Sequence, residues 1–108
     1  MVKICAHVSA ASSLDLSFEK ALHIGAEGSQ IFISPPRQWN QAKHSPEEIN
    51  RYKLKQLETK ISPNFIHGTY LVNLGTQKPE HLQKSIDWLT YALNEADALG
   101  IEGVIFHP

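Results

Sequence analysis

The 108-residue chain contains a single cysteine, Cys5, so no internal disulfide can form, which suits a reducing compartment. It also lacks an apolar run near the roughly 20 residues that a membrane helix needs, and it begins without a signal or transit-type segment. We therefore expect a cytoplasmic protein with no membrane partner. Cys5 lies in an apolar stretch, where we expect a small buried side chain and not a nucleophile.

The chain also has no large net charge, because its ten lysines and arginines nearly balance its eleven acidic residues. The overall charge therefore argues neither for nor against a polyanionic partner. No glycine-rich phosphate turn follows the first apolar segment, so a dinucleotide-binding fold is poorly supported.

Apolar strands alternate with amphipathic helices along the chain. The pattern predicts strands over 2–8, 28–34, 64–67 and 103–106, and helices over 14–24, 46–60 and 79–99. Ser45 and Glu48 have the spacing of a capping box, in which the serine caps the helix and the glutamate reaches back to it. The helix periodicity predicts that the following side chains face the core: Leu14, Phe18, Ala21, Leu22, Ile49, Tyr52, Leu57, Leu82, Ile86, Leu89, Leu93, Ala96 and Leu99.

Strict strand–helix alternation requires parallel strands and right-handed crossovers. Four strands with three helices fit a small open sheet or half of an eight-stranded barrel. No helix follows the last strand, which would leave an apolar edge that isolated proteins avoid. We therefore predict an α/β fold, a parallel TIM-barrel fragment with the first four strands and three helices. Residues 1–108 would form the N-terminal half of a (β/α)₈ barrel with no second domain, in a chain that we expect to be truncated.

The carboxyl ends of parallel barrel strands open on one face, where active sites lie. His67 and His107 end neighbouring strands about 4.8 Å apart, so both imidazoles can approach one zinc ion at about 2.0–2.1 Å. Tyr70 and Leu71 follow in a loop and offer a stackable ring. Two hydrogen-bonded histidines remain an equal alternative, because no Asp or Glu at a strand end supplies a third ligand. The other candidate histidines are expected at the surface: His23, His44 and His81.

Four segments in register resemble the N-terminal part of the endonuclease IV family, the zinc-dependent apurinic/apyrimidinic endonucleases also called deoxyribonuclease IV. They are Ala6-His7-Val8-Ser9-Ala10-Ala11, Arg37-Gln38-Trp39, His67 with Tyr70-Leu71-Val72-Asn73-Leu74-Gly75, and Phe106-His107-Pro108. The similarity covers the whole chain. The chain departs from the family at Ser12-Ser13, where Gly-Gly is usual, and at Pro35-Pro36, where more polar residues are usual.

The resemblance implies a xylose-isomerase-like barrel with a cluster of three zinc ions. It also implies an enzyme that cuts DNA 5′ to abasic sites in base excision repair. It implies no catalytic residue beyond the metal ligands, of which His67 and His107 would be the first two. The implied contacts to double-stranded DNA are Arg37 in the minor groove, Tyr70 and Leu71 wedged into the base stack, and His7 and Ser9. An inserted ring suits this substrate, because an abasic site has lost its stacking.

The remaining cluster ligands belong to the other part of the family's barrel, so we expect an incomplete zinc site and an inactive chain on its own. The family is monomeric, whereas an exposed sheet edge would let this chain self-associate. Two alternatives remain open: a sugar isomerase or epimerase of the same barrel superfamily, and a half-barrel remnant without catalytic activity.

Overall fold

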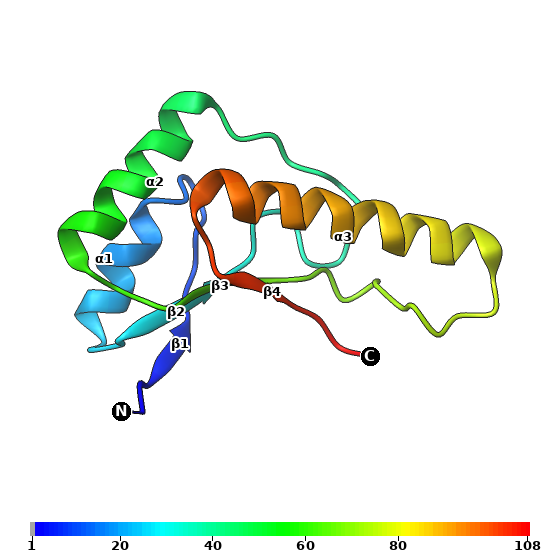
Figure 1. The fold of residues 1–108 in the computed structure, drawn as a ribbon, viewed down its shortest axis with the longest axis horizontal. Coiled ribbons are helices and arrows are strands. Elements are labelled where there is room, and N and C mark those ends of the chain that lie inside the picture. Colours follow the sequence, from blue (N-terminus) through cyan, green and yellow to red (C-terminus); the bar gives the residue numbers. More distant parts are fainter. Residues whose placement is uncertain (1) are drawn as a thin grey trace.

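Four parallel strands form one sheet in the order β1-β2-β3-β4, and a helix connects each strand to the next (Figure 1). The computed structural model describes residues 2–108. The strands are β1 (Cys5–His7), β2 (Gly28–Ile31), β3 (Asn64–His67) and β4 (Gly103–Ile105). The helices are α1 (Leu16–His23), α2 (Pro46–Thr59) and α3 (Pro79–Leu99). The predicted α/β order of parallel strands and helices is confirmed.

The first two strands are shorter than the apolar runs that predicted them. The ladder between β1 and β2 extends only from the Cys5–Gly28 pair to the His7–Gln30 pair. Residues 2–4, Val8 and residues 32–34 lie outside the strands, and the chain bends at residues 33–34, just after β2. In contrast, β3 and α3 have the predicted bounds, since a proline precedes or begins each and Gly100 adopts a left-handed conformation after α3.

The start of α2 confirms one half of the expected capping box. Ser45 Oγ accepts a hydrogen bond from the Glu48 backbone N–H at 3.1 Å, which caps the helix. The prediction that Glu48 reaches back to Ser45 is wrong. Its carboxylate instead accepts a hydrogen bond from the Leu14 backbone N–H at 2.8 Å. Glu48 therefore joins the start of α2 to the loop that precedes α1.

All three helices cover the same face of the sheet, and the opposite face, which we call the open face, is uncovered by residues 2–108 (Figure 1). Strand side chains alternate between the two faces, so Ala6 packs on the core while Cys5 points to the open face. The prediction that Cys5 is buried is therefore wrong. Its strand lies at the edge of the sheet, and no helix packs on that side.

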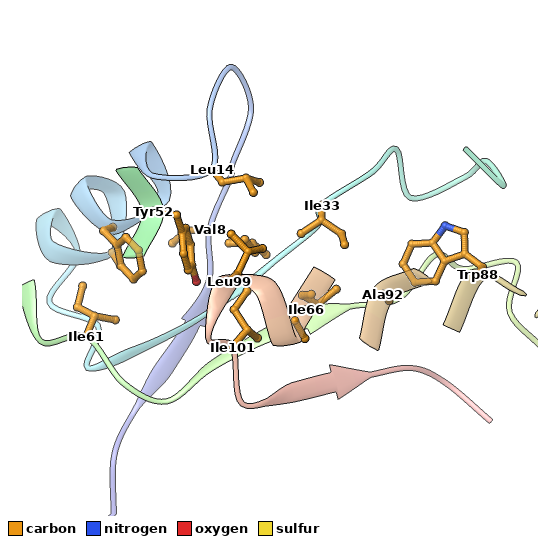
Figure 2. Close-up of a cluster of buried hydrophobic side chains, with 14 of the residues drawn as sticks. Val8, Leu14, Ile33, Tyr52, Ile61, Ile66, Trp88, Ala92, Leu99 and Ile101 are labelled. Atoms are coloured by element: carbon orange, nitrogen blue, oxygen red, sulfur yellow. The ribbon is translucent and has the colours of Figure 1, made fainter. Parts of the chain in front are cut away.

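The core lies between the sheet and the helices, with Trp88 at the end of the cluster away from Tyr52 (Figure 2). In α3 the buried stripe consists of Ser85, Trp88, Ala92, Ala96 and Leu99. Four predicted core side chains are instead exposed, namely Leu22, Leu57, Ile86 and Leu93. In α3, Ala96 and Leu99 are buried as predicted, while Ile86 and Leu93 lie next to the buried Ser85 and Ala92 and face outward.

Tyr52 is 1% exposed, and its hydroxyl has no hydrogen-bond partner among residues 2–108. Burial, with a smaller contribution from the charge of Glu102, raises the pKa of Tyr52 well above its usual range. The unfolded chain therefore loses this proton near pH 10, about the ordinary tyrosine pKa, while the folded chain keeps it. Stability must then fall as the pH rises further, because the folded state binds more protons.

We expect the free energy of unfolding to fall more steeply above about pH 10 in the wild type than in Tyr52→Phe, by up to about 1.4 kcal/mol per pH unit. Urea unfolding of both proteins at several alkaline pH values measures the difference. Lysine titration contributes equally to both and cancels. Identical slopes would show that Tyr52 ionises as easily in the folded chain as in the unfolded one.

Candidate functional site

His67 and His107 meet at the carboxyl ends of β3 and β4. His67 ends β3, and the register pairs it with Ile105, two residues before His107. The two Nε2 atoms are 3.3 Å apart. His67 is buried and His107 is exposed, so the pair lies at the rim of the open face. The expectation that the carboxyl ends of parallel strands meet on one face thus identified two neighbouring residues that are 40 positions apart in the sequence.

The state of the His67 ring follows from its second nitrogen. Nδ1 lies 2.7 Å from the Gly68 carbonyl oxygen, which can only accept, so Nδ1 carries a proton and Nε2 is the ring nitrogen that offers a lone pair in the neutral tautomer. This hydrogen bond is the usual second contact of a histidine that binds a metal. Two nitrogens at the zinc–imidazole distance from one tetrahedral ion are roughly 3.3–3.4 Å apart. The observed distance therefore fits two ligands of one ion, and it equally fits a hydrogen bond between the two rings, the alternative left open by the sequence.

No group of three or more His, Cys, Asp or Glu side chains within residues 2–108 has the arrangement of a complete metal site. A catalytic zinc takes three protein ligands. The described part of the chain therefore offers at most two nitrogen ligands at this position.

Aromatic rings surround His67 on the open face. The Phe32 ring lies 5.2 Å from His67, 4.6 Å from His7 and 5.7 Å from Tyr70, measured between centroids. Phe32 was not among the predicted site residues, because it belongs to the apolar run Ile31-Phe32-Ile33 and its composition indicates only a buried strand. The bend after Ile31 brings its ring to the site.

Hydrogen bonds join the loop after β2, residues 32–45, to the loop after β3, residues 68–78. We call the parts of these loops that face each other, residues 35–39 and 69–72, the lip. Thr69 Oγ1 lies 2.8 Å from the Pro36 carbonyl oxygen and 3.1 Å from that of Gln38. The Tyr70 backbone N–H also donates to Pro36, at 2.8 Å. Arg37 and Tyr70 are exposed, while Leu71 is half-buried. The two loops that carry Arg37, Tyr70 and Leu71 therefore form one connected surface beside His67.

His7 faces the same side but is not positioned as a cation. Gln30 Nε2 donates to His7 Nδ1 at 3.0 Å, and burial, followed by the nearby His67 ring, lowers the pKa of His7. A neutral His7 can offer only its Nε2–H to a ligand. Ser9 is exposed beside it, and its Oγ accepts from the Ala11 backbone N–H. An open groove of about 650 Å³ separates this loop from residues 42–44.

The surface prediction holds for His23 but is wrong for His44 and His81. The His44 side chain is only 8% exposed and its Nδ1 lies 3.5 Å from Glu95 Oε2. His81 is half-buried, with Nε2 2.7 Å from the Leu71 carbonyl oxygen. Glu95, the partner of His44, is distant in the sequence, and Leu71, the partner of His81, lies in an irregular loop. No local sequence pattern could therefore indicate these contacts.

Several known proteins are similar to this chain, although no protein-family model matches it. A protein of Persephonella marina named probable endonuclease 4 is 41% identical over 107 residues, which are 99% of this chain and 38% of that protein. The crystal structure of endonuclease IV from Thermus thermophilus matches 99% of this chain with a TM-score of 0.93 and 33% identity. This chain covers 40% of that structure.

A 3-keto-D-glucoside 4-epimerase from E. coli matches 94% of the chain with a TM-score of 0.61 but only 15% identity, which shows a shared fold alone. The chain spans about two-fifths of the length of the endonuclease relatives that it matches. The four strands and three helices thus have the arrangement of part of a TIM-barrel enzyme. None of the helices within residues 2–108 is long and apolar enough to cross a membrane.

Proposed function

We propose, for a chain related over its whole length to endonuclease IV proteins, that it forms the first four strands and three helices of a zinc-dependent apurinic/apyrimidinic endonuclease. Such an enzyme hydrolyses the DNA backbone 5′ to an abasic site, in base excision repair. Residues 1–108 would be the N-terminal half of its xylose-isomerase-like (β/α)₈ barrel. The 3.3 Å approach of the His67 and His107 Nε2 atoms beside the lip carries this proposal.

His67 and His107 would hold zinc, with Nδ1 of His67 anchored on the Gly68 carbonyl. Bound zinc activates water and stabilises the charge that develops on a phosphate. The open face would direct both imidazoles toward the substrate side, and Phe32 would limit the movement of the His67 ring. The full cluster of three ions would need ligands beyond the two histidines that residues 2–108 bring together.

Arg37, Tyr70 and Leu71 would form the DNA-contacting part of the lip. Tyr70 is 55% exposed, with its ring near those of His67 and Phe32, so it can enter a base stack without leaving the site. A vacant position in the stack is the feature that separates an abasic duplex from an intact one. His7 and Ser9 would contact the backbone of the same duplex as neutral donors.

Binding to a duplex with a tetrahydrofuran abasic analogue, compared with the intact duplex by fluorescence anisotropy, tests the substrate. The chain should prefer the abasic duplex, and Tyr70→Ala should reduce that preference roughly tenfold, as expected for the loss of one stacking ring. Arg37→Ala should weaken binding and lower its salt dependence. Lys53→Ala, which removes an exposed cation on α2, serves as the charge control.

Equal affinity of the wild type for both duplexes would contradict the proposed substrate. Preference for small sugar phosphates over DNA would favour an epimerase, a function that gives no role to the exposed Arg37 and Tyr70.

We further propose that the 108-residue chain does not cleave DNA alone, because residues 2–108 bring no third metal ligand to His67 and His107. Incubation with zinc and an abasic duplex should give no turnover, and robust cleavage would refute this. The unpaired edges of β1 and β4 would support self-association. Light scattering should then show a defined dimer, whereas a monomer at every concentration would exclude that role of the edges.

A further inference from the structure

His81 contacts both loops of the lip at once. It lies in the first turn of α3, and its Nε2–H donates to the Leu71 carbonyl oxygen at 2.7 Å. The edge of its ring packs against Trp39, with centroids 5.3 Å apart and the planes at 80°. Trp39 follows Arg37 by two residues, and Leu71 follows Tyr70. One side chain thus connects the segments that carry the proposed DNA contacts.

The same face of α3 holds these loops at further points. Ser85, one turn after His81, accepts a hydrogen bond from the Asn73 backbone N–H at 3.0 Å. Trp88 donates from Nε1 to the Asn40 carbonyl oxygen at 3.2 Å. Residues spaced by three and four share one helix face, so His81, Ser85 and Trp88 form a row that both loops contact.

These contacts matter because the lip has no regular structure of its own. Residues 35–39 and 69–72 lie outside all helices and strands, and segments of this kind depend on individual tethers for a fixed position. Ser85 and Trp88 are also buried members of the helix face that packs on the sheet. His81 lies beyond the buried core, so its main contacts are those with Trp39 and Leu71.

We infer that His81 is a positioning residue, which fixes the Leu71 carbonyl and the Trp39 ring so that Arg37 and Tyr70 keep their relative places before DNA arrives. The role in DNA binding rests on the proposed function, whereas the ordering of the two loops by His81 can be measured without DNA. Preorganised groups bind more tightly, because less conformational freedom is lost on association.

Amide hydrogen exchange of His81→Ala, measured by NMR, tests the order of the lip and of Asn73, which follows it. The Tyr70 and Asn73 amides, which bond to Pro36 and Ser85, should exchange roughly three- to tenfold faster, as the loss of one net hydrogen bond allows. Amides of β2 and β3 should exchange as in the wild type. His81→Gln keeps a side-chain N–H of similar reach and should restore slow exchange. His23→Ala, which removes an exposed histidine of α1, should change nothing.

The affinity for the abasic duplex should weaken by a similar factor, roughly three- to tenfold, in His81→Ala and recover in His81→Gln. Unchanged exchange at Tyr70 and Asn73, or faster exchange throughout the sheet, would overturn the inference. So would unchanged affinity in His81→Ala if the wild type does prefer the abasic duplex. If the wild type shows no such preference while lip exchange still rises in His81→Ala, the proposed function fails and the positioning of the loops by His81 stands.

Discussion

Replacing His67 or His107 by alanine is expected to weaken zinc binding by the chain at least about a hundredfold. Loss of a group that merely orients a ligand already costs about tenfold to a hundredfold in metal affinity, and each substitution removes one of two ligands. The Nε2 atoms of the two residues are 3.3 Å apart, whereas the ring of His7 lies 6.1 Å from that of His67 between centroids. Isothermal titration with zinc, at a pH where imidazole is neutral, measures the effect.

His7→Ala is the matched control for that experiment. The His7 ring lies on the same face, 6.1 Å from His67 between centroids, but its Nδ1 is occupied by Gln30. We expect its zinc affinity to stay within about threefold of the wild type, well below the effect of removing a ligand. Equal losses in His7→Ala and His67→Ala would mean that zinc binds the histidines of this face without a defined site.

Trp88→Ala should lower the free energy of unfolding by about 3–5 kcal/mol, the range for a buried aromatic residue reduced to alanine. Trp88 is 1% exposed, and its replacement leaves a cavity beneath α3 and removes the hydrogen bond from Nε1 to the Asn40 carbonyl oxygen. Domains of this kind are stable by roughly 5–15 kcal/mol, so a large fraction of the stability is at stake. Urea denaturation followed by circular dichroism gives the value.

Leu93→Ala, on the same helix, distinguishes the observed face of α3 from the predicted one. Leu93 is 57% exposed, so its replacement should change stability by no more than about 0.5 kcal/mol. If Leu93 belonged to the core, as its spacing from Ile86 and Leu89 predicts, the cost would be about 2–5 kcal/mol. A large loss for Leu93→Ala together with a small one for Trp88→Ala would reverse the orientation of the helix.

The order and direction of the strands could be predicted because they depend on local composition and on the chirality of crossovers. The ends of α3 were also predictable, since Pro79 and Gly100 act through their own backbone. The rotation of α3 was predictable only in part, since Ala96 and Leu99 are buried as expected whereas Ile86 and Leu93 are exposed. Its periodicity counts every leucine and isoleucine equally, whereas close packing on the sheet selects small Ser85 and Ala92 around Trp88.

The candidate site was predictable to the same degree. Because parallel strands end on the same face, the sequence indicates that His67 and His107 can meet, and the structure brings them together. The sequence could not indicate Phe32, whose exposure to the site depends on a bend. Nor could it find His81, because its partners Leu71 and Trp39 come from two loops whose approach is a property of the whole fold.

The most direct test of the paired-histidine zinc site is a zinc titration of the chain with ¹⁵N-labelled histidine, observed through the ring nitrogens. We predict that zinc shifts the Nε2 resonances of His67 and His107 together, at the same zinc concentration, while Nδ1 of His67 stays protonated against Gly68. Shifts at only one of the two histidines, or at His23, His44 or His81 in their place, would contradict it.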